Sequence, residues 1–117
     1  MALEHIQIAI PTGTDATARA FWCDGLGLPE IDKPETLRDR GGLWLDLEGA
    51  ELHLGVEDTF APARKAHPGF AVRDINETAA RIEALGQIPR WDETIKNRRR
   101  FFAEDPFGNR LEFLQKD

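Results

Sequence analysis

Apolar and polar residues alternate in several short stretches of the chain, and this alternation predicts β-strands. Isoleucine occupies every second position in residues 5–10, and leucine or valine does so in residues 43–47 and 51–56. Residues 110–115 alternate in a similar way. Since successive side chains of a strand point to opposite faces, each stretch has an apolar face that can pack against a helix. Further strands are predicted at residues 67–72, 99–104, 29–31 and 89–92.

Two other stretches carry apolar residues at helical spacing. Residues 14–24 and 75–85 are predicted to be helices on this basis. Each helix runs into a Leu-Gly pair, Leu26-Gly27 and Leu85-Gly86, where glycine can adopt the left-handed conformation that ends a helix. The candidate N-cap residues are Thr14 or Asp15 for the first helix and Asp74 for the second.

The order of these elements is repeated. A strand opening with His5, a helix and about three strands are followed by a strand opening with His67, a helix and about three strands. The sequence therefore predicts an α+β fold of two βαβββ modules that form a curved mixed β-sheet cup, with the helices on the outer face. We expect a single domain over residues 1–117, with module one at about 1–57, a linker at about 58–66 and module two at about 67–117.

The faces opposite the apolar ones carry an unusual set of polar side chains. A sheet with one solvent-exposed face would also alternate, and that is the simpler interpretation. All three histidines of the chain, however, belong to these faces or to the start of a strand. A lined cavity explains this composition better than a solvated surface does. The polar residues predicted to line it and to contact a substrate are Gln7, Trp44, Asp46, Glu51 and Arg100.

The repeat pairs the candidate metal ligands. His5 and His67 open equivalent strands, while His53 and Glu112 each follow an equivalent turn glycine, Gly49 or Gly108, by four residues. Taken one at a time, a histidine is more often a surface or structural residue than a ligand. Together, three imidazoles and a carboxylate suit a divalent ion such as zinc, nickel, manganese or iron, with coordination positions left open for a substrate.

Charge and cysteine content narrow the function classes. The chain has a net charge of -6 and a pI near 5.1, which disfavours nucleic acid and anionic membranes as partners. Its single cysteine cannot form an internal disulfide, and no signal or membrane-spanning segment is apparent, so a reducing cytoplasm is the expected compartment. The strongest charge run is formed by Arg98, Arg99 and Arg100. It is either part of a solvated hairpin, or one of its arginines, together with Arg64 or Lys65, pairs with a carboxylate of the substrate.

The two-copy unit, Leu26-Gly27-Leu28 and above all residues 105–113, Asp-Pro-Phe-Gly-Asn-Arg-Leu-Glu-Phe, resemble the vicinal-oxygen-chelate superfamily. This superfamily includes the glyoxalases, the bleomycin-resistance proteins and the extradiol dioxygenases. The resemblance extends over essentially the whole chain. It implies a homodimer, a small-molecule substrate or ligand, and metal ligands at His5, His53, His67 and Glu112, with Glu112 as the candidate proton shuttle.

Several activities are compatible with the resemblance. A lyase or isomerase would stabilise negative charge on two neighbouring oxygens of its substrate, but glyoxalase I enzymes usually have glutamate where this chain has His53. An iron-loaded site of two histidines and Glu112 would instead imply a dioxygenase. Fosfomycin-resistance transferases have a threonine where this chain has Gln7, which disfavours that activity. The alternative to an enzyme is a metal-free binding or antibiotic-resistance protein like the bleomycin-resistance proteins, which bind a cationic drug in aromatic grooves; Trp44 and Trp91 are compatible with this.

Overall fold

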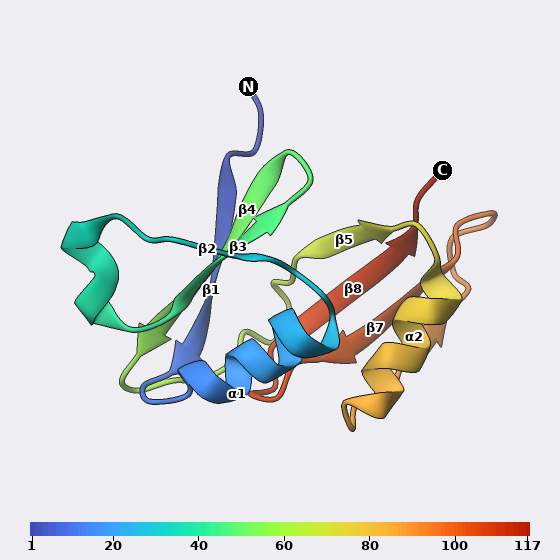
Figure 1. The fold of residues 1–117 in the computed structure, drawn as a ribbon. Coiled ribbons are helices and arrows are strands. Elements are labelled where there is room, and N and C mark those ends of the chain that lie inside the picture. Colours follow the sequence, from blue (N-terminus) through green and yellow to red (C-terminus); the bar gives the residue numbers. More distant parts are fainter. The chain divides into compact units, whose positions relative to one another are not determined.

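The first half of the chain forms a four-stranded mixed sheet, with a helix following its first strand (Figure 1). The computed structural model describes all 117 residues and divides them into unit 1, Met1–Ala61, and unit 2, Pro62–Asp117. The strand order in unit 1 is β1-β4-β3-β2, with β1 and β4 parallel and the other neighbours antiparallel. Its elements are β1 (His5–Pro11), α1 (Asp15–Arg19), a π-helix (Ala20–Gly25), β2 (Glu30–Ile31), a 3-10 helix (Glu35–Arg40), β3 (Leu43–Leu47) and β4 (Ala50–Glu57).

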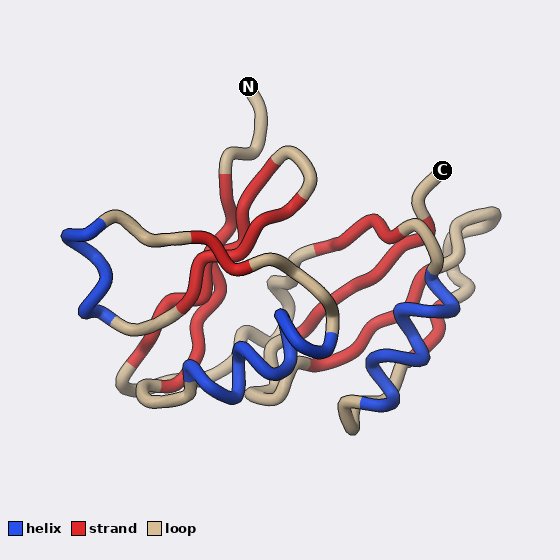
Figure 2. Tube along the Cα trace, viewed as in Figure 1, coloured by secondary structure: helices blue, strands red, loops and turns tan.

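Unit 2 repeats this arrangement with its own four strands (Figure 2). The order is β5-β8-β7-β6, again with the first and last strands parallel and the others antiparallel. Its elements are β5 (Gly69–Val72), α2 (Ile75–Ala84), β6 (Arg90–Asp92), β7 (Arg100–Glu104) and β8 (Arg110–Gln115). The predicted α+β fold of two βαβββ modules is therefore confirmed. That the two units form a single domain stays a prediction.

The apolar faces found in the sequence form the core of each unit. In unit 1 the buried side chains come from alternate positions of β3 and β4 and from the helical segment; in unit 2 they come from β7, β8 and α2. The buried set includes Leu43, Leu45, Leu52, Leu54, Phe21 and Trp22 in unit 1, and Phe101, Leu111, Phe113, Ile75 and Ile82 in unit 2. Burying each of these side chains stabilises the fold by roughly 1.5–3 kcal/mol relative to leaving it exposed.

The first helix differs from its prediction in two ways. Only residues 15–19 are α-helical; the chain then continues as a π-helix in which Leu26 N donates to Phe21 O at 3.0 Å. Neither predicted N-cap side chain caps it: the Thr14 hydroxyl donates to Pro11 O at 2.6 Å, and the Asp15 carboxylate instead accepts from Gly42 N at 3.0 Å. The 3-10 helix at Glu35–Arg40 was not predicted, because its sequence shows no apolar periodicity.

Other local predictions are confirmed. Asp74 caps α2 by accepting from Glu77 N at 3.1 Å, and Gly86 follows the helix with a φ of 85°. The Asp105 carboxylate organises the turn between β7 and β8 by accepting from Phe107 N and from both nitrogens of Asn109. Burial raises the pKa of the Asp105 carboxyl, although these hydrogen bonds oppose the rise. No helix of the protein combines the length and apolar character that crossing a bilayer requires.

Gly42 is a position where only glycine fits, for two separate reasons. Its φ is +83°, and a Cβ built there would lie 2.1 Å from the backbone oxygen of Leu54 on the neighbouring strand. Its N–H also donates to Asp15 at the start of α1. A side chain at this position would therefore force β3 and β4 apart next to the residues that pair Leu43 with Leu54.

We expect Gly42→Ala to lower the free energy of unfolding by about 3 kcal/mol or more, because left-handed strain and a backbone clash add together. Gly13→Ala is the matched control: Gly13 has a φ of +79°, but a Cβ added there would have nothing within 4 Å, so it should cost only about 1–2 kcal/mol. Urea denaturation of both variants measures the difference. Equal losses of unfolding free energy in the two variants would show that the clash with the Leu54 backbone contributes nothing.

Candidate functional site

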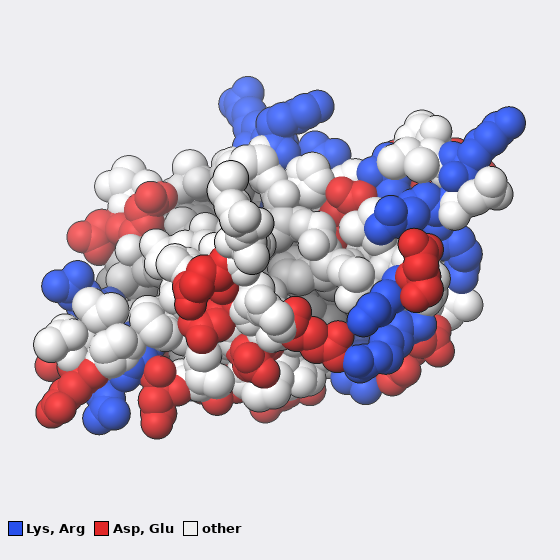
Figure 3. All heavy atoms as spheres, turned by 90° about the horizontal axis from the view of Figure 1, so that it is seen from above, with Lys and Arg blue, Asp and Glu red and all other residues white.

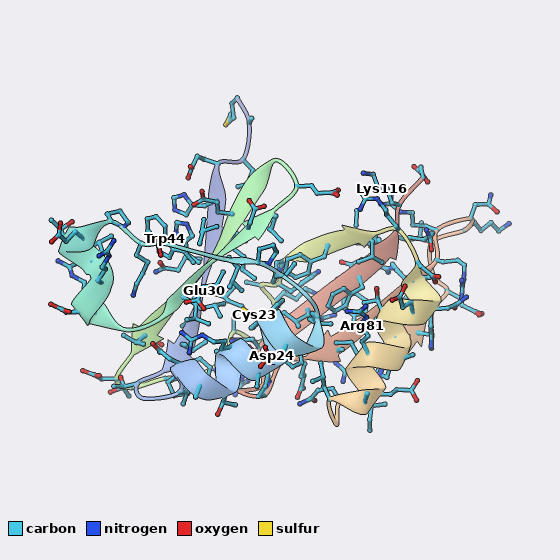
Figure 4. The ribbon with its side chains drawn as sticks, in the orientation of Figure 1. Cys23, Asp24, Glu30, Trp44, Arg81 and Lys116 are labelled. Carbon is cyan, nitrogen blue, oxygen red and sulfur yellow. The ribbon has the colours of Figure 1, made fainter.

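In unit 1, adjacent parallel strands bring two histidines together. The register of β1 and β4 pairs Gln7 with His53, so His5 lies two residues along the strand from the position opposite His53. The two imidazole rings stack, with centroids 4.3 Å apart and 14° between their planes. Trp44, opposite His53 on β3, stacks on the same ring at 3.9 Å and 4°. Trp44 is labelled on the sheet of unit 1 in Figure 4.

Carboxylates hold both of these imidazoles. His53 Nε2 lies 2.9 Å from Glu51 Oε1, and His5 Nδ1 is hydrogen-bonded to the Glu4 carboxylate. The His53 side chain is only 6% exposed, whereas that of His5 is 46% exposed. On the polar face of β4, the rings of Trp44 and His5 therefore shield the His53 ring from solvent.

The other residues of unit 1 predicted to contact a substrate lie around this stack. Gln7 is exposed on β1, and its side chain lies over Gly55. A Cβ added at Gly55 would be only 2.7 Å from Gln7 Nε2. Asp46 is exposed on β3, directly opposite Glu51. An open hollow of about 280 Å³ lies beside the β3–β4 turn, lined by Glu4, Asp46, Leu47, Gly49, Ala50 and Glu51.

Unit 2 brings together the remaining two predicted ligands. His67 precedes β5, and its Nε2 lies 2.9 Å from Oε1 of Glu112 on β8. Phe102 on β7 is opposite Glu112 and meets the edge of the His67 ring, with centroids 5.5 Å apart. The Glu112 side chain is 11% exposed and that of His67 is 27% exposed.

The hydrogen bond that His67 makes through Nδ1 constrains the state of its other ring nitrogen, Nε2. Nδ1 lies 3.0 Å from the backbone oxygen of Lys65, which can only accept, so Nδ1 carries a hydrogen. Nε2 then faces an oxygen of the Glu112 carboxylate. Two lone pairs would repel each other at this distance, so the pair needs either a proton or a metal ion on Nε2. His67 and Glu112 are two side chains of metal-ligand type, and no third one joins them within this unit.

Arg100 also binds Glu112. Its Nη1 donates to Glu112 Oε2 at 2.8 Å, and its Nη2 donates to Asp92 Oδ1 and Thr94 Oγ1, each at 3.1 Å. Burial acts to raise the pKa of the Glu112 carboxyl, but hydrogen bonds from Arg100 and His67, with their charges, outweigh it and lower that pKa. Arg100 thus has internal partners, and its predicted contact with a substrate stays a prediction.

The same relative placement holds in both units. In unit 1 the strand-opening His5 lies two residues before Gln7, the partner of His53; in unit 2 His67 lies two residues before Gly69, the partner of Glu112. Neither unit alone gathers three His, Cys, Asp or Glu side chains in an arrangement that could hold a metal ion. Each unit can therefore supply one pair of ligands, and the convergence of all four on one centre stays a prediction.

Some residues that contact the candidate ligands or Arg100 were not predicted from the sequence. Glu4 precedes the first strand, where alternation gives no information. Asp92 lies directly opposite Arg100 in the pairing of β6 with β7, but the weak pattern of residues 89–92 did not fix that register. Phe102 belongs to a stretch with two adjacent phenylalanines, so alternation could not assign its face.

Comparison with known proteins identifies the family. The sequence matches the family model of the Glyoxalase/Bleomycin resistance protein/Dioxygenase superfamily over residues 2–113. The chain belongs to this superfamily. No curated protein matches the sequence, but solved structures of superfamily members do resemble this one.

One similar structure is a glyoxalase family protein from Bacillus anthracis, with 40% identity and a TM-score of 0.94, covering 100% of this chain and 96% of that chain. Two more distant structures share the fold of the superfamily. A glyoxalase/dioxygenase from Nostoc punctiforme has 18% identity and a TM-score of 0.80, covering 99% of this chain and 91% of its own. Lactoylglutathione lyase from Agrobacterium tumefaciens has 19% identity and a TM-score of 0.74, and the match covers 97% of this chain and 92% of the lyase chain.

The lowered pKa of Glu112 predicts a pH-dependent contribution to stability in metal-free protein. The folded chain favours the ionised carboxylate, so the contribution is complete above the ordinary value of 4.5 and is lost as the pH falls through the lower folded-state value. We expect Glu112→Gln to lower the free energy of unfolding at pH 7 by about 2 kcal/mol, and the difference from wild type to shrink below pH 4.5.

Denaturant unfolding between pH 3 and pH 7 measures this dependence. Glu83→Gln, at an exposed carboxylate on α2, controls for the loss of one negative charge. A difference between wild type and Glu112→Gln that stays constant over the whole pH range would contradict the assignment of the ion pairs as its source.

Proposed function

We propose that this chain is a metal-dependent glyoxalase-like lyase or isomerase, or a dioxygenase, acting on a small oxygen-rich molecule. The observation that supports the proposal is the His67–Glu112 pair, because an imidazole nitrogen and a carboxylate oxygen, both of them common metal-ligand atoms, lie 2.9 Å apart while His67 Nδ1 is hydrogen-bonded to Lys65. The names of similar structures, a glyoxalase/dioxygenase and a lactoylglutathione lyase, support the same range of reactions.

The ligands in this proposal are His5, His67 and Glu112. His67 would bind through Nε2, since Nδ1 donates to Lys65. His5 would also bind through Nε2, because its Nδ1 is hydrogen-bonded to the carboxylate of Glu4. A second nitrogen held by an oxygen acceptor is the usual arrangement for a metal-binding histidine, since it fixes the tautomer and the ring orientation.

His53 is proposed only as an additional ligand. Its ring is buried between Trp44 and His5, and its Nε2 is hydrogen-bonded to Glu51. Ligation through that nitrogen would require Glu51 to move or to share the ion. A set of two histidines and one carboxylate remains when His53 is left out, and such a set is typical of non-haem iron oxygenases.

The protein residues around the ligands would bind and orient the substrate. A bound divalent ion would supply Lewis-acid stabilisation of negative charge on two neighbouring substrate oxygens. Gln7 offers an exposed amide, and Trp44 offers an aromatic surface at the end of the ring stack. Glu112 is also the proposed proton shuttle, but its lowered pKa makes it a weaker base, which supports the ligand role more strongly.

The second candidate function is metal-free binding of a small molecule, as in an antibiotic-resistance protein. The stack of Trp44, His53 and His5 favours it, because all three rings already have partners within the protein. Carboxylates of Glu4 and Glu51 lie beside these rings. Aromatic faces next to carboxylates suit a cationic ligand.

Metal binding separates the two candidates. We expect protein purified without added metal to retain a divalent ion by elemental analysis, and the metal-free form to bind Zn²⁺ in calorimetry. His5→Ala and Glu112→Ala should each weaken binding by about 100-fold or more, because removing a ligand costs more than removing one of its supporting partners. Glu104→Ala, at an exposed carboxylate of β7, is the control.

The contrary result is also well defined. If wild-type protein binds no metal, or if both ligand variants bind Zn²⁺ as wild type does, the metal-dependent activity is wrong. Metal-free binding is then the remaining function, and it can be tested directly with cationic aromatic compounds by tryptophan fluorescence, since Trp44 lies in the proposed site.

We also propose that the chain forms a homodimer in a reducing cytoplasm. Unit 1 holds 4 Lys and Arg against 12 Asp and Glu, whereas unit 2 holds 11 against 9. Side chains of both signs are exposed on the face drawn in Figure 3. The net charges of the two units are therefore opposite, so a contact of unit 1 of one copy with unit 2 of another would bring unlike charges together.

Sedimentation at increasing salt tests this assembly. We expect a dimer at low ionic strength whose dissociation constant rises several-fold between about 0.05 and 0.5 M NaCl, because salt screens attraction between unlike units. Sucrose at matched osmolality is the control for a solvent effect without screening. A monomer at every salt concentration would refute the dimer, and a dimer that tightens with salt would refute its electrostatic origin.

A further inference from the structure

We propose that Arg110 binds the carboxylate of a small anionic ligand on the polar face of unit 2. This proposal rests on the proposed small-molecule function, under either of its two candidates, and adds to it the charge of the ligand. It begins from the burial of the arginines. Arg100 and Arg110 are partly buried, whereas every other arginine of the chain is exposed.

The two partly buried arginines differ in their partners. The acceptors of Arg100 are the side chains of Glu112, Asp92 and Thr94. The guanidinium of Arg110 makes no hydrogen bond or ion pair within the protein and lies over the ring of Phe102. Glu104, which is opposite Arg110 in the pairing of β7 with β8, is exposed and forms no ion pair with it. Arg110 therefore keeps its full capacity to donate to a ligand.

Phe102 holds the Arg110 guanidinium in place. The guanidinium carbon lies 4.6 Å from the ring centroid, which is a cation–π distance. Phe102 is only 9% exposed and belongs to β7, so the surface beneath the guanidinium is fixed. A guanidinium that lies over a ring still presents the N–H groups of its edge to a planar acceptor. Binding through that edge then costs little further side-chain freedom.

Arg110 shares a face of the sheet with the His67–Glu112 pair. Arg110 and Glu112 are two residues apart on β8, so their side chains point to the same side. The His67 ring meets the same Phe102 ring, with centroids 5.5 Å apart. Because Arg110 and His67 both contact Phe102, a small molecule held by Arg110 can extend to the candidate ligand pair.

The charges on this face favour a carboxylate as the bound group. Glu112 and Asp92 form ion pairs with Arg100, whereas Arg110 adds a positive charge without a partner. Unit 2 as a whole also holds 11 Lys and Arg against 9 Asp and Glu. A carboxylate matches one guanidinium in charge and in bidentate geometry. A phosphate group carries about −1.5 to −2 and three acceptor oxygens, which is more than one guanidinium satisfies.

Nuclear magnetic resonance of the arginine Nε–H groups tests this binding. Glycolate is the probe, because it is a small carboxylate with a neighbouring hydroxyl oxygen; glycolamide is its uncharged counterpart, and phosphate is the competing anion. The loss of one signal in Arg110→Gln assigns the Arg110 group. We expect glycolate to shift this signal to saturation, with a dissociation constant at least about 10-fold lower than that of phosphate at equal ionic strength. Glycolamide should leave the signal unchanged.

Two further variants separate the guanidinium from its charge and from its surroundings. Arg110→Lys keeps the charge but loses the planar fork, so glycolate should bind about 10-fold more weakly, as followed by the backbone amide signals of β8. Arg98→Gln is the matched control. Arg98 also has no hydrogen-bonded partner, but it is exposed and precedes β7, so its removal should leave glycolate binding at Arg110 unchanged.

The contrary outcomes are distinct from those for the proposed function. If glycolate shifts the Arg110 and Arg98 signals alike without saturation, or if glycolamide or phosphate binds as tightly as glycolate, the carboxylate site is wrong. A loss of stability on urea unfolding of Arg110→Gln, with no saturable binding in wild type, would leave Arg110 a structural role only. Zn²⁺ binding decides the metal-dependent function separately: a wild type that binds glycolate at Arg110 but no Zn²⁺ keeps the carboxylate site and refutes only the metal.

Discussion

The parallel pairing of the first and last strands of each unit is the constraint on which both the core and the candidate site depend. The pairing of β1 with β4 and of β5 with β8 fixes which side chains share a face. A shift of one residue would turn Leu52 and Leu54 out of the core and bury the polar face instead. The same register sets His5 diagonally from His53, and His67 diagonally from Glu112. Packing of the core therefore also fixes how the candidate ligands of each unit lie relative to each other.

The fold could be predicted from the sequence because its signals are local. Alternation in residues 43–47 and 110–115 located β3 and β8 to the residue, and the repeat gave the order of elements in both units. Parity and the repeat also picked out the four candidate ligands, but their pairing within each unit depends on the registers of β1 with β4 and of β5 with β8. What could not be predicted depends on contacts between strands: the burial of His53 requires the Trp44 ring to lie across it, and the partners of Arg100 require the register of β6.

The candidate ligand pairs of the two units have chemically different surroundings. In unit 1 the rings of Trp44, His53 and His5 stack in that order, and each imidazole is also hydrogen-bonded to a glutamate. In unit 2 the pair is part of a chain of hydrogen bonds that runs from His67 through Glu112 to Arg100 and Asp92.

This difference shows how two copies of one fold can present different side chains at equivalent positions. Both units follow the same register, so equivalent positions can evolve independently without disturbing the core. Replacing Gly42 by a large side chain is forbidden by the backbone oxygen of Leu54, which keeps an arginine out of unit 1. The equivalent position in unit 2 holds Arg100, which fixes a carboxylate. Backbone clearance thus excludes a large side chain at residue 42 of unit 1, while the equivalent position of unit 2 holds the arginine that binds Glu112.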